Sequence, residues 1–515
     1  METSSRIVKN TTFLYLKMAA SLFISLYTAR VFLAVLGASD YGLYTLVAGV
    51  IFMFGFLQDT MSRATLRYLC YYKANNDIDG QKKVYNISVV LHVGIAFIIA
   101  VNLLLVADFL FSGFLNIDAE RTDAARKVYY FMTASFAFTV MTVPYDAVLN
   151  ANENMLYYSI VGIAESLLRL LLALWLPYVE SDKLVFYAFF LTCITILSLV
   201  VRRVYCYKRY EECVLRPSLF DKVLARQMVT YAGWNFITSI TSLLAFNSMP
   251  LLLNTFFSTI VNAAQGIAAQ VNGVLTLFST NMLKALNPTI TKSGGIHDIQ
   301  KLTRFSATGS KLSFLIMCFF SVPIIVECPY ILSLWLVDVP EWTALFCVML
   351  LIRSLLNQLV TVYAECVYAS NDIRNYCIIK GILNILPIPL VYLSFSLGGA
   401  PYMLYVMLFV CWELLGGAVV VLFNKKMYGL VVGQYLKDVV APCIATLVLE
   451  FAIGATIAII MDETFARAAV NTVCVTLAFA ACSYFFVLTT DEKVLVARQI
   501  ASLKNKIGNH KKKSQ

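Results

Sequence analysis

The stretch Tyr85–Leu110, YNISVVLHVGIAFIIAVNLLLVADFL, decides which kind of fold this chain can adopt. Asp108 is its only charged residue. A helix of about 20 apolar residues crosses the roughly 30 Å hydrocarbon core of a bilayer, so this stretch predicts a membrane-spanning helix. The whole chain is similar, because 60% of its 515 residues are hydrophobic, 14% are charged and its mean hydropathy is +0.76. Such a composition excludes a soluble globular enzyme, a disordered chain and a disulfide scaffold.

Fourteen apolar runs of the sequence are long enough to span a bilayer, and most are joined by links of only a few residues. Long continuous runs indicate helices, whereas a β-barrel would show alternating segments of about 10 residues. The predicted fold class is therefore an all-α polytopic membrane protein with 14 transmembrane helices. The predicted spans lie near 11–36, 41–58, 85–110, 128–149, 155–178, 183–206, 229–254, 259–284, 305–328, 341–369, 372–397, 400–424, 437–461 and 465–488.

The distribution of Lys and Arg predicts the orientation of the chain. With the N-terminus inside and the spans alternating, 31 of the 40 basic residues lie in cytoplasmic segments, 5 lie outside and 4 lie within spans. This bias predicts that both termini are cytoplasmic. It also explains the net charge of +10 as a topology signal with attraction to anionic membrane lipids, so no nucleic-acid partner is expected.

The longest cytoplasmic link between predicted spans divides the first twelve spans into two sets of six. The predicted parts are an N-lobe at 1–206, the link at 207–228, a C-lobe at 229–424, a C-terminal hairpin of spans at 437–488 and a basic cytoplasmic tail at 489–515. Two halves related in this way are common among transporters. The arrangement therefore favours a transport function.

Charged side chains within spans are the sharpest functional signal, because each costs about 2.5–3.5 kcal/mol at mid-bilayer and usually faces the protein interior or water. Lys17 belongs to a polar stripe with Asn10, Ser21 and Ser25, which predicts a face lining an aqueous cavity. The alternative is that Lys17 snorkels to the inner surface. Arg30 is also a cavity candidate, although it lies on the opposite face, where snorkelling or an interhelical ion pair explains it better.

Two further arginines are candidates for contact with an anionic substrate. Glu165 and Arg169 are spaced i,i+4 and either line the cavity or neutralise each other as a structural pair. Arg353, near the centre of its span, has Asn357 on a neighbouring arc. An arginine at mid-depth suits phosphate, because its guanidinium matches two oxygens at once.

A neutral polar stripe marks the predicted span at 259–284. Asn262, Gln265 and Asn272 could form a hydrogen-bonding wall for sugar hydroxyls. The alternative is adhesion between helices, at about 0.6 kcal/mol for each polar side chain.

Three acids within spans, Glu365, Glu413 and Glu450, are candidates for binding a coupling ion, either H⁺ or Na⁺. Pairing with a neighbouring arginine, or protonation, is the alternative explanation for Glu413 and Glu450. No resident cofactor, metal ligand cluster or catalytic motif is predicted, since the sequence lacks the Walker A, HExxH and nucleophile-elbow patterns.

Four segments of the sequence resemble bacterial polysaccharide flippases of the Wzx type, within the multidrug/oligosaccharidyl-lipid/polysaccharide (MOP) exporter superfamily. They are LYTAR at 26–30, VLGASDYGLY at 35–44, FLQDTMSRATLRY at 56–68 and NPTITK at 287–292. The span count and the layout of six, six and two helices are also similar to that family.

The resemblance implies a MATE-like fold of two six-helix lobes that open alternately to each side of the bacterial plasma (inner) membrane. It implies transport of an undecaprenyl-diphosphate-linked oligosaccharide from the cytoplasmic to the outer leaflet. It further implies a central cationic cavity, for which Lys17, Arg169 and Arg353 are the matching residues. Other polysaccharide assembly proteins are expected partners.

Two other functions compete with this hypothesis. A cation-coupled multidrug antiporter of the related type usually has twelve spans, so the final hairpin disfavours it. A membrane-embedded polymerase or ligase would carry a large outer loop with catalytic residues, whereas the longest outer loop here, near 111–127, is short. The chain is therefore not expected to be an enzyme.

Overall fold

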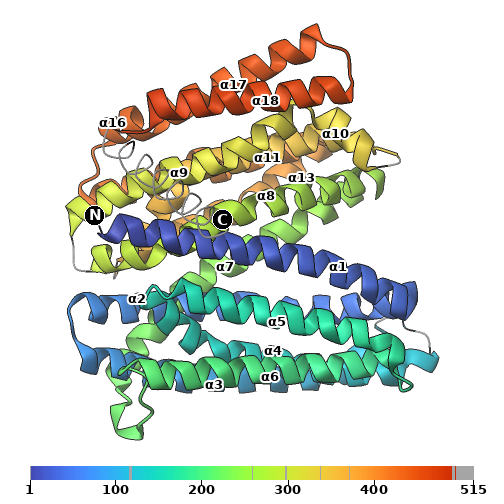
Figure 1. Cartoon of the computed structure of the whole chain (residues 1–515), viewed down its shortest axis with the longest axis vertical. Coiled ribbons are helices and arrows are strands. Elements are labelled where there is room, and N and C mark those ends of the chain that lie inside the picture. The colour runs from blue at the N-terminus through green and yellow to red at the C-terminus, as the bar shows by residue number, and fades with distance from the viewer. Residues whose placement is uncertain are drawn as a thin grey trace, which may run out of the picture. The chain divides into compact units, whose positions relative to one another are not determined.

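The computed structural model describes residues 2–114, 117, 119–257, 259–295, 298–336, 338–370, 372–489 and 493. Across these residues every regular element is helical and no strand occurs, which confirms the predicted all-α class (Figure 1). In the same residues, twelve helices are long and apolar enough to cross a membrane. The chain is accordingly a multi-pass membrane protein.

Two of the fourteen predicted spans differ from these twelve helices. The prediction at 41–58 does not correspond to one helix, because α1 (Glu2–Phe52) ends within it and α2 (Gly55–Ala74) begins there. The prediction at 259–284 is the first part of α8 (Thr259–Gly295), a helix whose polar residues keep it outside the twelve. The count of fourteen spans therefore stays a prediction.

Close packing divides the chain into two compact units. Unit 1 comprises Met1–Phe246, Thr280–Leu302 and Glu365–Ile385, and unit 2 comprises Asn247–Ser279, Thr303–Ala364 and Leu386–Gln515. The division passes through the middle of several long helices, whereas the predicted lobes end between helices. The lobe boundaries at 206 and 229 stay predictions, and the predicted tail falls almost wholly outside the described residues.

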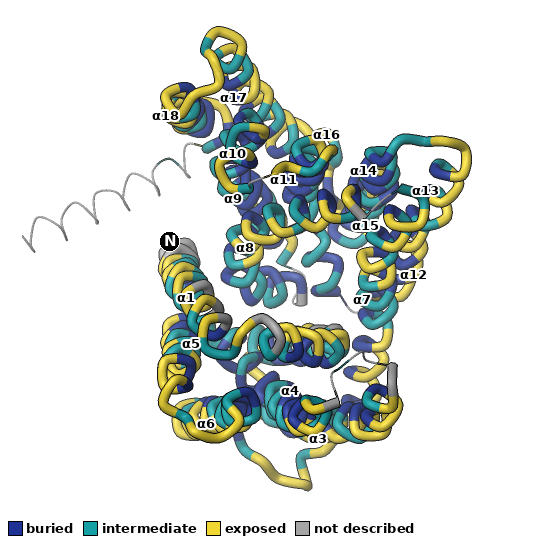
Figure 2. The backbone as a smooth tube through the Cα atoms, turned by 90° about the vertical axis from the view of Figure 1, so that its right-hand side faces the viewer, coloured by how far each residue is buried: buried dark blue, intermediate teal, exposed yellow. Residues whose placement is uncertain are grey.

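Unit 1 is built around α4. Its helices are α1, α2, α3 (Ile78–Phe109), α4 (Thr122–Ala151), α5 (Met155–Trp175), α6 (Lys183–Arg209), most of α7 (Lys222–Phe256), the end of α8, the start of α9 (Ile299–Val326), the end of α11 (Thr343–Ala369), and α12 (Arg374–Ile385). Helix α4 packs against α3 and α6, and α1 packs against α5. Figure 2 shows the buried residues along α4 between these neighbours. Tyr129 and Val140 of α4 are fully buried and contribute through close packing against the neighbouring helices, since lipid is as apolar as the helix interior.

Unit 2 contains the beginning of α8, most of the later helices and the C-terminal hairpin. Its later helices are α9 (Ile299–Val326), α10 (Cys328–Trp335), α11 (Thr343–Ala369), α13 (Pro387–Ser396), α14 (Met403–Leu408), α15 (Gly416–Tyr428), α16 (Val432–Tyr435), α17 (Ala441–Ile460) and α18 (Phe465–Cys482). One core cluster joins Phe314 of α9, Leu355 of α11 and Cys443 of α17. Helices α17 and α18 pack against each other as a hairpin.

Polar side chains fix where several helices begin. Asp77 accepts a hydrogen bond from the backbone N–H of Gly80 at the start of α3, and Asn154 accepts one from Tyr157 at the start of α5. Thr464 plays the same role for α18. Each such cap satisfies a donor that the helix leaves open and typically contributes about 1 kcal/mol.

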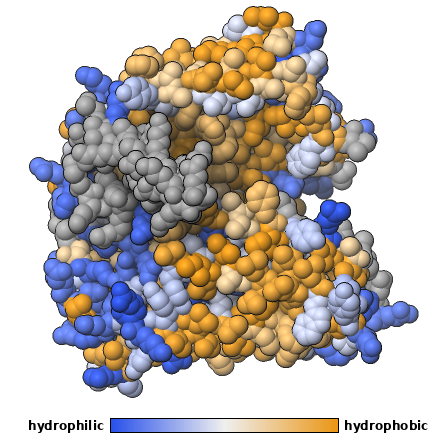
Figure 3. All heavy atoms as spheres, viewed as in Figure 1, coloured by the Kyte–Doolittle hydropathy of each residue, from blue (hydrophilic) through white to orange (hydrophobic). Residues whose placement is uncertain are grey.

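The surface of unit 1 has the pattern of a membrane protein. Figure 3 shows hydrophobic residues over the middle of α5 and α6 and hydrophilic residues toward the helix ends. Large exposed side chains on these helices include Leu171, Leu197 and Val200. Cys193 of α6 is exposed among them, while the other twelve cysteines are buried or half-buried and all thirteen are free.

Candidate functional site

The centre of the candidate site is a tyrosine contacted by two lysines within unit 1. Tyr158 projects from the first turn of α5, Lys17 from α1 and Lys284 from the C-terminal part of α8. The Nζ atoms of Lys17 and Lys284 lie 4.0 and 4.1 Å from the centre of the Tyr158 ring, and Lys284 Nζ donates to the Tyr158 hydroxyl at 2.6 Å. Two like charges are thus held around one aromatic ring, whose π-face attracts cations.

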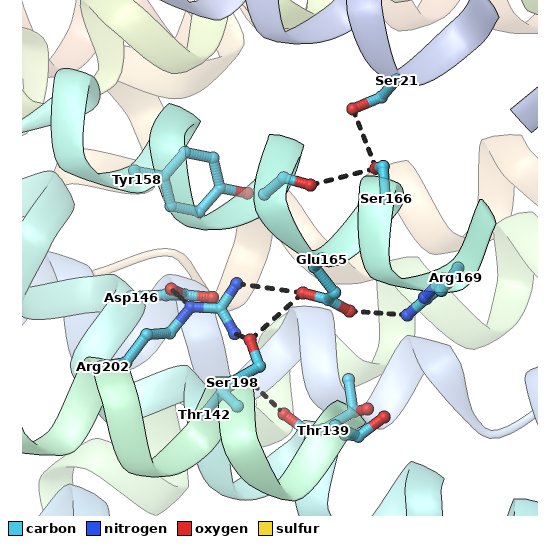
Figure 4. Close-up of polar contacts among 12 residues, drawn as sticks. Ser21, Thr139, Thr142, Asp146, Tyr158, Glu165, Ser166, Arg169, Ser198 and Arg202 are labelled. Atoms are coloured by element: carbon cyan, nitrogen blue, oxygen red, sulfur yellow. Dashed lines mark hydrogen bonds and ion pairs between the residues drawn. The ribbon is translucent and has the colours of Figure 1, made fainter. Parts of the chain in front are cut away.

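Gly162 makes room for this arrangement. It follows Tyr158 by one helical turn, and a Cβ atom at position 162 would lie 2.3 Å from Cε of Lys17. One turn further, Ser166 donates to Ser21 of α1 at 3.2 Å, which fixes α1 against α5 beside the lysine (Figure 4). The polar stripe predicted on α1 therefore contacts α5 through Lys17 and Ser21.

An ion-pair network continues from α5 toward α6 and α4. Figure 4 shows Arg202 of α6 between two carboxylates: its Nε lies 3.2 Å from Asp146 of α4, and its Nη2 lies 3.6 Å from Glu165 of α5. Glu165 also accepts from Arg169 at 2.6 Å and from Ser198 at 3.2 Å. Arg202 is 9% exposed and Arg169 is 45% exposed, so the network runs from a buried ion pair to an open end.

The charges of this site do not balance. Lys17, Lys284, Arg169 and Arg202 carry four positive charges, while Asp146 and Glu165 carry two negative ones. Arg202 lies against both carboxylates and Arg169 donates to Glu165, so the excess of two positive charges falls on the lysine pair. The arrangement can therefore bind an anion at the Tyr158 end.

A second ion pair holds the end of α8 in unit 1. Lys292, two turns beyond Lys284, donates to Glu153 at 2.6 Å. Glu153 lies in the turn between α4 and α5 with a left-handed backbone conformation (φ 56°). This contact fixes the helix that carries Lys284 next to the turn that precedes Tyr158.

The structure places the other predicted residues of unit 1 apart from this cluster. Glu365 of α11 accepts from Arg63 of α2 at 2.9 Å, so the predicted coupling acid belongs to an ion pair. Arg30 is exposed and lies in the first part of α1, before the kink at Gly37. The predicted roles of Glu365 as a coupling acid and of Arg30 as a cavity residue stay predictions.

In unit 2, three predicted residues lie together. Arg353 and Asn357 of α11 both donate to Glu413, at 3.3 and 2.7 Å, and the Arg353 guanidinium lies 5.1 Å from the centre of the Trp412 ring. Glu413 lies in the π-helical segment Phe409–Leu415, a type of helical irregularity that is frequent at functional sites. Arg353 and Asn357, predicted for the substrate cavity, and Glu413, predicted for the coupling ion, thus form one polar group.

The remaining predicted residues of unit 2 have separate surroundings. Gln265 of α8 is buried and accepts from the Tyr405 hydroxyl, whereas Asn262 and Asn272 are half-buried. Glu450 of α17 is fully buried and accepts from the thiol of Cys318 at 3.6 Å. No group of three or more His, Cys, Asp or Glu residues in the described ranges could hold a metal ion.

Comparison with known proteins identifies the fold. No protein-family model matches the chain, and no curated protein matches its sequence. A crystal structure of MATE in the straight conformation matches with a TM-score of 0.73 and 13% identity, over 83% of this chain and 96% of that one. The chain has the MATE fold. The likeness extends to an outward-facing multidrug resistance MATE transporter of the MOP superfamily, with a TM-score of 0.71, 13% identity and the same coverage.

Two further structures with this fold come from named organisms. A MOP superfamily transporter from Pyrococcus furiosus matches with a TM-score of 0.71 and 12% identity, over 83% of this chain and 96% of that one. A MATE transporter from Vibrio cholerae matches with a TM-score of 0.70 and 14% identity, over 83% of this chain and 99% of that one. The predicted MATE-like fold is confirmed.

Three residues of the cluster were not predicted from the sequence. Lys284 and Arg202 belong to the basic residues that the charge distribution assigns to the cytoplasmic side, and Asp146 is not among the predicted site residues. Helix α8 continues through Pro288 to Gly295, so Lys284 lies well inside a helix. The spacing along α6 gives a usable signal for Arg202. It lies four residues after Ser198, so both side chains share one helical face, and this face is buried.

Proposed function

We propose that the chain is a transporter that moves an undecaprenyl-diphosphate-linked oligosaccharide from the cytoplasmic to the outer leaflet of the bacterial inner membrane by alternating access. The observation that supports this most is the excess positive charge of Lys17 and Lys284 around Tyr158. A diphosphate carries the complementary charge, and charge-assisted hydrogen bonds are about twice as strong as neutral ones. Hydroxyls of Tyr158, Ser21 and Ser166 suit the sugar that follows the diphosphate.

The test is export of surface polysaccharide in a flippase-deficient strain that expresses this chain. The wild type should restore surface polysaccharide, and the double variant Lys17→Gln/Lys284→Gln should reduce export about a hundredfold or more, since each of the two lost bonds to a charged group weakens binding by about 1.5–3 kcal/mol. Lys208→Gln, which removes an exposed charge from the end of α6, is the matched control and should export normally. No restoration in any of several matched strains, with the protein inserted, would contradict the proposal.

A cation-coupled multidrug antiporter is the alternative, supported by the multidrug transporters that share the fold. A cationic drug would be repelled by the lysine pair, so for such drugs this function predicts that Lys17→Gln/Lys284→Gln raises drug resistance or leaves it unchanged. Resistance profiles of the wild type and of this variant separate the two functions.

A further inference from the structure

A second candidate site lies in unit 1, away from the lysine pair. The C-terminal end of α2, the first part of α7 and the start of α12 enclose a pocket of about 510 Å³. Its walls carry Tyr68, Tyr71 and Tyr72 from α2, and Tyr231 and Trp234 from α7. Five aromatic rings around one pocket provide flat apolar walls whose polar ends are hydrogen-bonding groups.

The charged residues of the pocket favour an anion. Arg226 and Arg374 line it from α7 and α12 and are both exposed, while Asp372 is the opposing acid. Beneath the wall, Arg67 of α2 is only 4% exposed and lies 4.7 and 4.8 Å from the centres of the Tyr68 and Tyr231 rings. Two exposed guanidinium groups above a buried one give the pocket a positive potential.

Aromatic rings contact two of these three arginines, Arg67 and Arg374. The Arg374 guanidinium lies 5.4 Å from the centre of the Trp234 ring, and Tyr68 packs edge-on against Tyr231 at 6.2 Å. Tyr231 in turn donates to the carbonyl oxygen of Tyr368 at the end of α11. An arginine stacked on a ring keeps its N–H groups free to bind in the plane of the guanidinium, which matches two phosphate oxygens.

The pocket lies where its helices enter or leave the apolar layer. Helix α2 ends at Ala74 after Lys73, and α7 begins at Lys222, so the pocket is at the end of unit 1 that carries the basic links. Tyrosine and tryptophan gather at the level of lipid headgroups, and basic pockets between helices on the cytoplasmic side bind anionic headgroups.

We propose that this pocket binds the headgroup phosphate of an anionic membrane lipid from the leaflet on the side of the basic links; the choline cation of zwitterionic phosphatidylcholine, next to its phosphate, opposes binding to the two arginines. Arg226 and Arg374 bind the phosphate oxygens, and the tyrosine and tryptophan rings contact the glycerol or first sugar next to it. The pocket is distinct from the Lys17–Tyr158–Lys284 cluster, and the proposal does not depend on the proposed transport function.

The experiment is native mass spectrometry of the purified full chain titrated with phosphatidylglycerol or with phosphatidylcholine. The wild type should bind the first phosphatidylglycerol at least tenfold more tightly than Arg226→Gln/Arg374→Gln does, while phosphatidylcholine binding should be equal in both. Arg203→Gln/Arg209→Gln, which removes two exposed arginines from the same end of α6, is the matched control and should change phosphatidylglycerol binding less than threefold.

Three results would overturn the proposal. The first is equal phosphatidylglycerol binding in the wild type and in the Arg226→Gln/Arg374→Gln variant. The second is a loss of phosphatidylglycerol binding in the α6 control as large as in that variant. The third is displacement of phosphatidylglycerol by millimolar inorganic phosphate, which would identify a site for free anions. If the double variant does not fold, Trp234→Leu tests the same site without changing its charge and should weaken phosphatidylglycerol binding several-fold. Unchanged binding by folded Trp234→Leu would likewise contradict the proposal.

Discussion

At the scale of single residues, Gly162 determines where the Lys17 ammonium group of the candidate site lies. The end of the Lys17 side chain occupies the space that a Cβ atom at Gly162 would need. The atoms in the way belong to the flexible end of a lysine, so a methyl group there displaces that end and leaves the backbone in place. The position of Lys17 therefore depends on the lack of a Cβ atom at residue 162 of α5.

We expect Gly162→Ala to fold normally and to reduce polysaccharide export about tenfold, because the Lys17 ammonium group is moved from the Tyr158 ring. Gly94→Ala is the matched control: it lies in α3 of the same unit, a Cβ atom there meets nothing within 4 Å, and alanine favours the helix by about 1 kcal/mol. Export rates and thermal stability of the two variants measure the effect. Normal export by Gly162→Ala would exclude a role for the position of Lys17.

The ion pairs of Arg202 make a second prediction at this scale. Arg202→Gln leaves Asp146 and Glu165 without their buried partner, so we expect a loss of stability of about 3–5 kcal/mol. The triple variant Asp146→Asn/Glu165→Gln/Arg202→Gln removes the uncompensated charges and should recover most of that loss. Melting temperatures of the purified variants give the comparison, and equal melting temperatures for the single and triple variants would count against this account.

At the scale of helices, one acid joins three elements at the predicted outer end of unit 1. Asp182 caps α6 by accepting from the backbone N–H groups of Leu184 and Val185, at 3.0 and 3.1 Å. It also accepts from Arg121 at 2.6 Å, and Arg121 donates to Asp40 of α1 at 2.9 Å. Burial alone would raise the pKa of Asp182, but the hydrogen bonds from Val185, Arg121 and Leu184 hold this pKa below its ordinary value of 3.8.

Because the folded state lowers the pKa of Asp182, its carboxylate stabilises the fold above pH 3.8, and this contribution is lost as the pH falls through the lowered value. We expect Asp182→Asn, which can still cap α6, to melt below the wild type at pH 7 and to approach it as the pH falls below 3.8. Asp182→Ala also loses the cap and should melt lower still, by about 1 kcal/mol of stability. A constant difference between wild type and Asp182→Asn across this pH range would refute the explanation.

The helices also show which features of the structure the sequence predicts and which it does not. Continuous apolar runs predicted the all-α class and the positions of most spans, because lipid requires long apolar helices. The sequence did not predict Lys284 as a site residue, because the predicted span ended there, before Pro288. In the structure α8 continues to Gly295 and its end packs within unit 1. Contacts such as those of Lys284 and Tyr158 join residues over a hundred positions apart, and spacing along one helix cannot reveal them.

At the scale of whole units, a buried ion pair holds the C-terminal hairpin against the rest of unit 2. Arg467 of α18 donates to Glu327 at 2.8 Å, and Asn471, one turn later, donates to the other oxygen of Glu327 at 2.6 Å. Glu327 is 1% exposed and precedes α10. Next to it, Gly454 of α17 is so close to Val326 that a Cβ atom would lie 2.8 Å from the valine methyl carbon.

We expect Arg467→Gln to cost about 3–5 kcal/mol, because it leaves Glu327 buried and unpaired. Hydrogen exchange of α17 and α18 should rise, while that of α3 and α4 in unit 1 should stay as in the wild type. Arg467→Gln/Glu327→Gln, which removes both charges, should restore slow exchange in the hairpin. Uniformly faster exchange throughout the chain would show instead that the pair stabilises the whole molecule.

The exposed thiol of Cys193 gives the chain a built-in depth marker. It lies mid-way along α6 among large apolar side chains, whereas the other cysteines are buried or, in the case of Cys474, half-buried. In intact membranes it should react with a bilayer-permeant maleimide and resist a charged, water-soluble one, whereas after transfer to detergent both reagents should label it. The chain therefore carries its own chemical readout of insertion, with no engineered cysteine required.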